Sequence, residues 1–515
     1  MSTAIPTNTP RITAFPTNTP RPTFTWTPSP TLTPTITLIP TETLTPSPTL
    51  RPSLTWTPSA TPTPSRTPTA TPSPYPFEGT YATPVDIPLV EIPGPAPIVE
   101  NDPDIINFVL LGSDTTSESA GRTDVIVLVS VNRRAGNVAM WHLPRDLIVY
   151  VPGYTMERIN LAYATGIQNN FPGGGPGIIK ETILYNFGIP IDYYARVNFT
   201  DFQEIIETLG GLDISVDCQI TDWALISPDH DPTVEENWEQ YTLGIGRKRL
   251  SPYYALWYSR SRVTTSDLDR GRRQLDVLRA IYVQARAQGL LAQITELWPQ
   301  AIEIVNTDLE LSDALNLLPL ANSLEIQNIE RFNGRVNVHF SSYTTPDGRS
   351  VLLPNWEAIR TLAYNFVTPP TSNRLENDAV RIEIVDSSAY GIGFDLVAAD
   401  RLAWEGFSAL PLGNTTGSIR EITLIYDYTG ATKGSALENV MEILRVGDSQ
   451  VIFEPDPNRT VDFRVEMGRD YNSCIYGSSA DELAPRPPVE EFGGTLEEEA
   501  SPLAPTPAGQ PNTVG

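Results

Sequence analysis

The pattern of hydrophobic and polar positions changes twice along this chain. From residue 104 to about residue 368, near-continuous apolar runs alternate with stretches in which apolar residues recur every three or four positions. The first pattern predicts buried strands and the second predicts amphipathic helices. Because strands that alternate with helices are typical of layered α/β domains, we predict one such domain over residues 104–368.

The expected elements of this domain are short strands and longer helices. The strands are expected at residues 106–114, 124–132, 137–146, 194–200 and 210–217. The helices are expected at residues 158–168, 176–187, 200–209, 267–288, 290–305, 311–321 and 354–366.

A second, smaller unit is predicted after a polar, Pro-containing linker at residues 369–378. It covers residues 379–476 and mixes strands and helices, as an α+β domain does. Its expected strands are residues 379–387, 407–413 and 419–428 and segments near 450 and 461, and its expected helices are residues 391–405 and 433–446.

The two ends of the chain have a different composition. Residues 1 to about 76 repeat short Pro/Thr/Ser units such as "PTNTPR", and a less repetitive Pro-rich lead-in continues to residue 103. Such a segment buries too little apolar surface to fold, and its prolines favour an extended, semi-rigid spacer. We predict a disordered stalk over residues 1–103, either a plain linker or an O-glycosylated one, and a disordered acidic tail over residues 484–515.

Charge and cysteine content narrow the functional classes. The formal net charge is −26 and the pI is about 4.5, which argues against non-specific binding to nucleic acid. The two cysteines, Cys218 and Cys474, exclude a disulfide framework and a thiolate metal cage. Because they fall in different predicted domains, we expect two unpaired thiols, with a disulfide between them as the alternative.

A cluster of arginines stands out against this acidic background. In "YSRSRVTTSDLDRGRRQ" (258–274), Ser266 or Asp267 is a suitable N-cap for the long expected helix. Arg270, Arg273 and Gln274 would then share one face of its first two turns. Free N–H groups and the helix dipole favour an anion at such an N-terminus.

Two further arginines precede this helix. Arg260 and Arg262 are two positions apart and would point to the same side of a strand. The alternative to an anion site is a solvated basic patch, balanced by Asp267, Asp269 and Asp276.

Charged residues also mark the ends of the predicted strands, where ligands bind in open α/β sheets. Asp114 ends the first strand, Arg122 and Asp124 begin the second, and Arg145 and Asp146 follow the third. Arginine binds phosphate through paired N–H groups, and Mg²⁺ binds one or two carboxylates together with phosphate oxygens. The combination therefore suits a diphosphate with a divalent ion, with internal Arg–Asp pairs as the alternative.

Several of these segments follow one another as they do in a known family. In chain order they are "NFVLLGSD", "GRTDVIVLVSV", "LPRDLIV", "RINLAYATG", "YYARVNFTDFQEIIETLGGLDISVD", "ALWYSRSR" and "DLDRGRRQLDVLRA". Residues 104–368 thereby resemble the LytR-CpsA-Psr family, and residues 379–476 are similar to the LytR C-terminal domain. The resemblance implies a three-layer α-β-α domain with a mixed central sheet, followed by the small α+β domain.

The same resemblance implies roles for individual residues. Mg²⁺ would be held by Asp114 and Asp124. The diphosphate would be bound by Arg122, Arg145, Arg260, Arg262, Arg270 and Gln274. Arg272 is the alternative to Arg270, because the loop before the helix is about two residues shorter than in the common family pattern. Arg273 would support the binding residues without contacting the diphosphate itself.

The activity implied is transfer of a glycopolymer phosphate from a polyprenyl diphosphate to peptidoglycan, with Asp124 as base and Arg145 on the phosphate. A hydrolase of the same lipid and a non-catalytic wall-binding scaffold are the alternatives. The resemblance also implies an extracytoplasmic protein at the membrane surface. The sequence contains no signal peptide and no apolar run of about 18 residues. We therefore expect a membrane helix encoded upstream of Met1.

Overall fold

The structure is a computed structural model that describes residues 91–99, 102–114, 122–262, 266–368, 370, 374, 377–415, 417–430 and 435–474. All of these described residues belong to one compact unit. The predicted acidic tail and nearly all of the predicted stalk lie outside the described residues.

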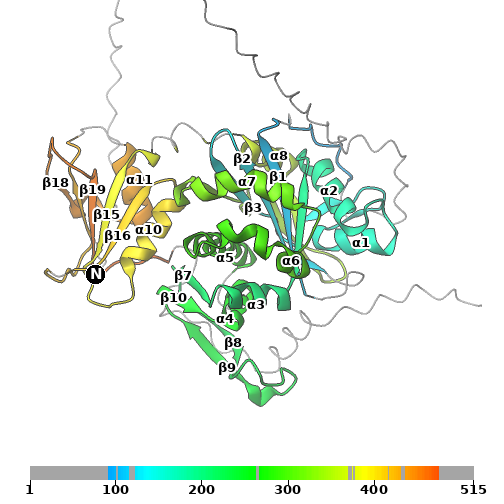
Figure 1. Ribbon diagram of the computed structural model, residues 1–515, viewed down its shortest axis with the longest axis horizontal. Coiled ribbons are helices and arrows are strands. Elements are labelled where there is room, and N and C mark those ends of the chain that lie inside the picture. The colour runs from blue at the N-terminus through cyan, green and yellow to red at the C-terminus, as the bar shows by residue number, and fades with distance from the viewer. Residues whose placement is uncertain are drawn as a thin grey trace, which may run out of the picture. The chain divides into compact units, whose positions relative to one another are not determined.

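A six-stranded mixed sheet is the centre of the larger domain (Figure 1). Its strand order is β11-β6-β1-β2-β3-β12. β1 pairs antiparallel with β2 and parallel with β6, so the mixed sheet implied by the sequence is confirmed. The strands are β1 (Ile105–Ser113), β2 (Thr123–Asn132), β3 (Asn137–His142), β6 (Tyr193–Asn198), β11 (Asn306–Thr307) and β12 (Ile329–Asn333).

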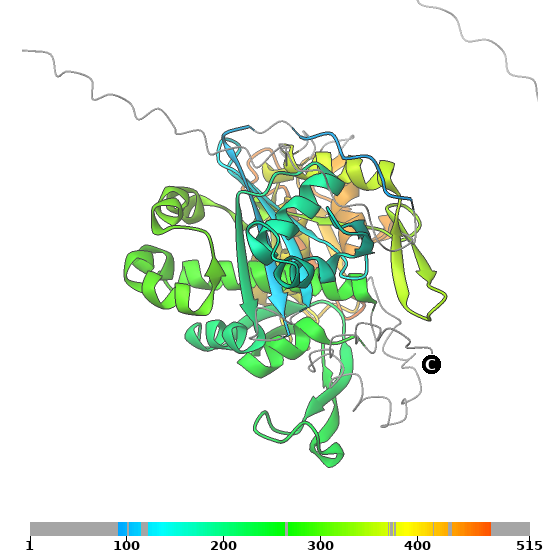
Figure 2. The ribbon, with the colours of Figure 1, turned by 90° about the vertical axis from the view of Figure 1, so that its right-hand side faces the viewer.

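Helices pack on both faces of this sheet. On one face, α2 (Gly174–Phe187) and α8 (Trp356–Val367) bury a core with β1, β2 and β3, and α1 (Ala162–Gln168) packs beside α2. Figure 2 shows α1 and α2 in front of the strands. On the other face, α5 (Asp267–Ala287) packs Leu275 and Leu278 against β2 and β3. The expected three layers are therefore present.

Four small two-stranded sheets complete the described part of this domain. They pair β4 (Ile148–Tyr150) with β5 (Met156–Arg158), β7 (Leu212–Val216) with β10 (Gly246–Leu250), β8 (Ile220–Leu225) with β9 (Trp238–Leu243), and β13 (Phe340–Thr344) with β14 (Ser350–Pro354). The sequence predicted β7 and none of the other strands in these pairs. The remaining helices are α3 (Phe199–Thr208), α4 (Pro252–Arg260), α6 (Ile294–Ile304) and α7 (Leu311–Ser323). No helix among the described residues has the length and apolar character needed to cross a lipid bilayer.

Helix α4 corrects one expectation. Arg260 and Arg262 do not lie on a strand: Arg260 is the last residue of α4, and Arg262 lies just beyond it. The helix forms because Ser251 caps the backbone N–H of Tyr254 and Pro252 occupies the first turn, where its missing N–H costs nothing. Its Tyr and Trp side chains then pack into a separate core with β7 and β8.

Residues 381–474 build a second sheet with its own core. The order β16-β15-β19-β17-β18 uses β15 (Arg381–Asp386), β16 (Ser408–Asn414), β17 (Leu424–Asp427), β18 (Val451–Phe453) and β19 (Phe463–Met467). Two helices, α10 (Phe394–Trp404) and α11 (Ser435–Leu444), cover it and contribute to the buried core. We call residues 381–474 the C-terminal module.

The two cysteines form a disulfide, contrary to our expectation of unpaired thiols. Cys218 follows β7 and Cys474 follows β19, and their Cα atoms lie 4.5 Å apart across 256 residues of sequence. The expectation was wrong because it assumed that residues in different domains do not meet. The C-terminal module packs through α10 against β7 and β10, which brings the two segments together.

Candidate active site

Two aspartates lie side by side at one edge of the sheet. Ser113 of β1 pairs with Thr123 of β2, so Asp114 and Asp124 directly follow paired positions. Burial, followed by the charge of Asp124, raises the pKa of Asp114 to about 6. The Oδ1 atom of Asp114 is buried without a hydrogen-bond partner. The two carboxylates are therefore close enough to repel each other, as carboxylates that share a cation do.

Asp124 is also held by neighbouring side chains. Arg145, which follows β3, places Nη1 3.2 Å from Asp124 Oδ2. Asn160 donates from Nδ2 to Asp124 Oδ1 at 3.3 Å. Arg145 Nε lies 3.4 Å from Asp146. The predicted residues Asp124 and Arg145 thus meet directly.

Arg158 belongs to this group although the sequence interpretation gave it no role. Its Nη1 lies 3.2 Å from Asp146 Oδ1, at the end of β5. Burial and then the charge of Arg158 lower the pKa of Arg122, which places the two guanidinium groups near each other. The signal for Arg158 was its position at the start of the segment "RINLAYATG".

The start of α5 brings a second set of charges. Ser266 caps the helix by accepting a hydrogen bond from Asp269 N at 3.1 Å. Arg270 lies 2.7 Å from Asp267 Oδ1, and Arg262 lies 3.8 Å from the same atom. Burial lowers the pKa of Arg270 to about 10, Asp267 opposes this effect, and the charge of Arg145 adds to it. Charged side chains just after β3, just after α4 and at the start of α5 therefore lie close together.

Arg272 points elsewhere. It lies within 3.1 Å of carboxylate oxygens of Asp217, Asp269 and Asp276, and its side chain is 5% exposed. These carboxylates already bind the guanidinium N–H groups of Arg272 that a phosphate would otherwise bind. The geometry therefore favours Arg270 over Arg272 for a phosphate contact, which stays a prediction.

Arg260 and Gln274 complete the predicted set. The guanidinium of Arg260 lies 4.4 Å above the ring of Phe199, and burial lowers its pKa while Asp124 and Asp114 raise it. Gln274 donates to Ser259 O at 3.1 Å, and its Oε1 is buried without a partner.

An apolar cavity of about 250 Å³ reaches Arg260 and Gln274. It lies between the sheet and helices α3, α4 and α5. Other lining residues are Leu111, Val125, Ala195, Phe202, Val277 and Ile281. Gly112, two positions before Asp114, also lines it, and Val125 directly follows Asp124. An apolar lining and the polar side chains of Arg260 and Gln274 therefore meet in one cavity.

The two aspartates fit a Mg²⁺ ion that takes its remaining ligands from a substrate and water. No group of three or more His, Cys, Asp or Glu residues suited to a metal ion occurs in the described part of the chain. Mg²⁺ needs only one or two carboxylates when phosphate oxygens and water supply the rest. The partnerless buried oxygen of Asp114 suits such an ion.

The fold and the site define a class: α/β proteins in which a cluster of arginines and aspartates lies beside an apolar cavity. Residues 86–363 match the LytR_cpsA_psr family, and the chain belongs to that family.

Two named proteins and one solved structure have sequences similar to that of this chain. Polyisoprenyl-teichoic acid–peptidoglycan teichoic acid transferase TagU of Oceanobacillus iheyensis is 27% identical over 45% of this chain and 69% of its own. TagT of Bacillus subtilis, of the same described activity, is 29% identical over 44% of this chain and 68% of its own. The crystal structure of B. subtilis TagT has 25% identity over 53% of this chain and 96% of its own, with a TM-score of 0.39.

Proposed function

We propose that this protein transfers a glycopolymer phosphate from a polyprenyl-diphosphate carrier to peptidoglycan. The observation that carries the proposal is the apolar cavity that ends at Arg260 and Gln274, beside the Asp114–Asp124 pair. A polyprenyl diphosphate has this division into apolar chain and anionic head. The family relatives named above are transferases of polyisoprenyl-linked teichoic acid.

The residues around the site suit in-line phosphoryl transfer, which depends on positioning and charge stabilisation. An acceptor hydroxyl attacks the phosphorus nearer the glycan, and the bond from this phosphorus to the bridging oxygen breaks. Asp124, oriented by Asn160 and Arg145, takes the hydroxyl proton. Polyprenyl phosphate leaves with the bridging oxygen, and its charge is stabilised by Arg145, Arg260 and Arg270.

Mg²⁺ is part of this proposal, with Asp114 and Asp124 as its protein ligands. When bound, it offsets negative charge on the phosphate oxygens. Arg122 and Arg262 supply further positive charge at the same end of the sheet.

The decisive experiment supplies purified protein with a labelled polyprenyl-diphosphate glycan, peptidoglycan fragments and Mg²⁺. Label that becomes attached to peptidoglycan supports transfer. Label found only as free sugar phosphate or oligosaccharide shows hydrolysis instead and rejects the transferase proposal. Chelation by EDTA is expected to stop the reaction, and activity that persists in EDTA would reject the role of the ion.

Arg145→Ala tests the site assignment. We expect transfer to fall about 100- to 1,000-fold with the fold intact, because a charge-stabilising group at the reacting phosphate is removed. The matched control is Arg134→Ala, since Arg134 also pairs with aspartates but its side chain is 68% exposed on the surface. Turnover by Arg145→Ala equal to that of the control contradicts the assignment.

We also propose that the protein works outside the cytoplasm, at the membrane and cell wall. Both proposed substrates are found there, and a disulfide persists in such oxidising surroundings. Protease added to intact cells should degrade the protein. Resistance in intact cells together with digestion after lysis would contradict this location.

A further inference from the structure

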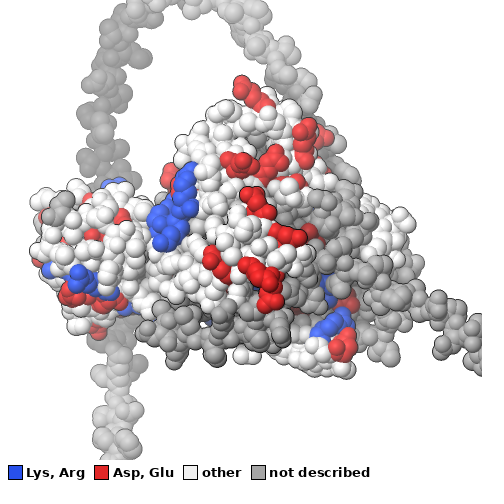
Figure 3. All heavy atoms as spheres, turned by 90° about the horizontal axis from the view of Figure 1, so that it is seen from below, with Lys and Arg blue, Asp and Glu red and all other residues white. Residues whose placement is uncertain are grey.

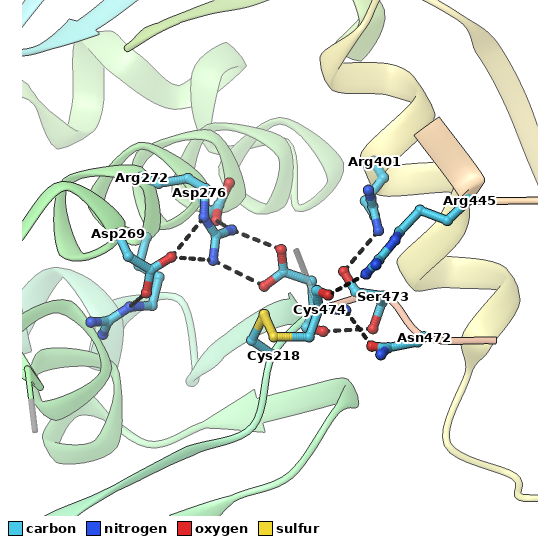
Figure 4. Close-up of a disulfide and its surroundings, with 11 residues drawn as sticks. Cys218, Asp269, Arg272, Asp276, Arg401, Arg445, Asn472, Ser473 and Cys474 are labelled. Carbon is cyan, nitrogen blue, oxygen red and sulfur yellow. Dashed lines mark hydrogen bonds and ion pairs between the residues drawn. A yellow bond between two sulfur atoms is a disulfide. The ribbon is translucent and has the colours of Figure 1, made fainter. Parts of the chain in front are cut away.

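A continuous series of polar contacts runs from the disulfide through Arg272 to Asp269 of α5 (Figure 4). It begins at the last described residues of the C-terminal module. Cys474 is bonded to Cys218, and the buried Ser473 donates from Oγ to Asp217 O at 2.5 Å. The C-terminal module is therefore fixed to the turn after β7 by a covalent bond and a hydrogen bond.

The module's own helices hold this segment from the other side. Arg401 of α10 donates to Ser473 O at 2.7 Å, and Arg445, just after α11, donates to Cys474 O at 2.8 Å. Backbone carbonyls on both sides of the junction are thus hydrogen-bonded, and the module is tied to Asp217 and Cys218.

Asp217 connects the module to α5 through its contact with Arg272. Its two oxygens face Arg272 at 2.9 and 3.1 Å, in the paired geometry typical of Arg–carboxylate contacts. Arg272 also binds Asp269 at 2.9 Å and Asp276 at 3.0 Å. Burial lowers the pKa of Arg272, but the three carboxylates outweigh it and raise that pKa above the ordinary value.

Asp269 continues the series towards the site. Its Oδ2 lies 3.4 Å from Nε of Arg273, which is fully buried. Arg273 donates to the carbonyl oxygens of Tyr258 and Ser261. These carbonyls lie on either side of Arg260 and directly before Arg262, so the guanidinium of Arg273 holds the backbone from which both predicted phosphate-binding side chains extend.

We propose that Asp217 and Arg272 are positioning residues and that the Cys218–Cys474 disulfide anchors them. They keep the end of α4 in place, so that Arg260 and Arg262 are already oriented when the diphosphate binds. This inference rests on the proposed function for its effect on catalysis. The reason is general: functional side chains need buried supporting contacts to hold their geometry, and a misplacement of about 1 Å can cost up to about 100-fold in rate.

Two variants interrupt the series at different points. Cys218→Ser with Cys474→Ser removes the covalent anchor, and Arg272→Gln removes the central cation. A matched control is Arg279→Gln, because Arg279 also joins α5 to the C-terminal module, through Asp400 at 2.7 Å, and is equally buried. Arg279 lies about two turns beyond Arg272 on α5 and contacts Asp400 and the ring of Trp404, both in the C-terminal module, so it tests the module contact alone.

The first readout is hydrogen exchange of the backbone amides at residues 253–262 in the intact protein, without substrate. We expect faster exchange there in the double serine variant and in Arg272→Gln, and wild-type exchange in Arg279→Gln. Wild-type exchange in the double serine variant overturns the inference, whatever the activity. Equally fast exchange in Arg279→Gln also overturns it, because the effect would then come from general loosening of the module.

The second readout is affinity for a polyprenyl diphosphate compared with the polyprenyl alcohol. We expect the double serine variant to bind the diphosphate about tenfold more weakly and the alcohol unchanged, since only the charged head is mispositioned. Unchanged diphosphate affinity overturns the inference. If the wild-type protein binds no polyprenyl diphosphate, the proposed function fails, and the exchange measurement still decides the positioning role.

Discussion

At the scale of single residues, close packing brings the arginines of α5 up to the sheet. Gly271 lies between Arg270 and Arg272, and a Cβ atom there would be 2.1 Å from His142 Nδ1. No larger residue fits without displacing the buried imidazole. Gly271 therefore lets the first turn of α5 approach the end of β3, where Arg145 follows.

His142 gives this packing a pH dependence. Burial lowers the pKa of His142 to about 4, Asp267 opposes this shift, and Arg270 adds to it. Between about pH 4 and 6.5 the unfolded chain binds the proton and the folded protein does not. The contribution of neutral His142 to stability is therefore complete above about pH 6.5 and is lost as the pH falls towards 4.

The variant His142→Gln tests this pH dependence, through the free energy of unfolding measured in urea from pH 4 to 7. The free energy of unfolding of the wild type, minus that of the variant, should rise with pH by up to about 3 kcal/mol. Asp114, whose raised pKa acts in the opposite direction, is present in both proteins and cancels in the difference. A difference that does not change with pH would contradict the buried neutral state of His142.

At the scale of elements, β6 and α5 form opposite walls of the apolar cavity. Ala195 of β6 and Ile281 of α5 both line it, and its surface is almost entirely apolar. A cavity with such walls favours hydrocarbon over water. On its exposed surface the protein is different: the face in Figure 3 shows scattered acidic side chains and only small groups of Lys and Arg.

Ala195→Phe should fill part of this cavity. We expect weaker binding of a long polyprenyl diphosphate, by about tenfold or more, because apolar contacts of the chain are lost. A diphosphate with a single short prenyl group should bind as before. The control is Ala292→Phe at an exposed position before α6. Equal loss for the short and long lipids would mean that the cavity is not the site of the chain.

At the scale of the whole described structure, a covalent bond joins two units that have separate cores. The disulfide closes a loop of 256 residues, and the buried Arg272 network lies directly beneath it. A cross-link over so long a loop restricts the unfolded chain strongly. The module should therefore contribute to the stability of the catalytic domain.

Reduction is expected to lower the unfolding temperature of the wild type. The loss in unfolding free energy should be about 2–5 kcal/mol, the range for a native disulfide. The double serine variant should unfold at the same lower temperature with or without reductant. A fall in its unfolding temperature on adding reductant would show that the effect has another cause.

The amino-acid sequence by itself determined the strands β1, β2, β3 and β6 of the central sheet, several of its covering helices, and the segments that carry charge at strand ends. Periodicity is a local property, so β1, β2 and α5 were visible from their own residues. The helix start was predictable for the same reason, with Ser266 or Asp267 as N-cap, and the structure shows that Ser266 is the cap. The site residues at strand ends followed from where the strands stop.

Only the tertiary structure decided which charges face the site. Arg270 and Arg272 are two positions apart on one helix, yet Asp217, far away in sequence, neutralises only Arg272. The disulfide depends likewise on the packing of two units, and the apolar cavity depends on several elements meeting. Such contacts are set by side chains brought together over long sequence separations, and no local pattern contains them.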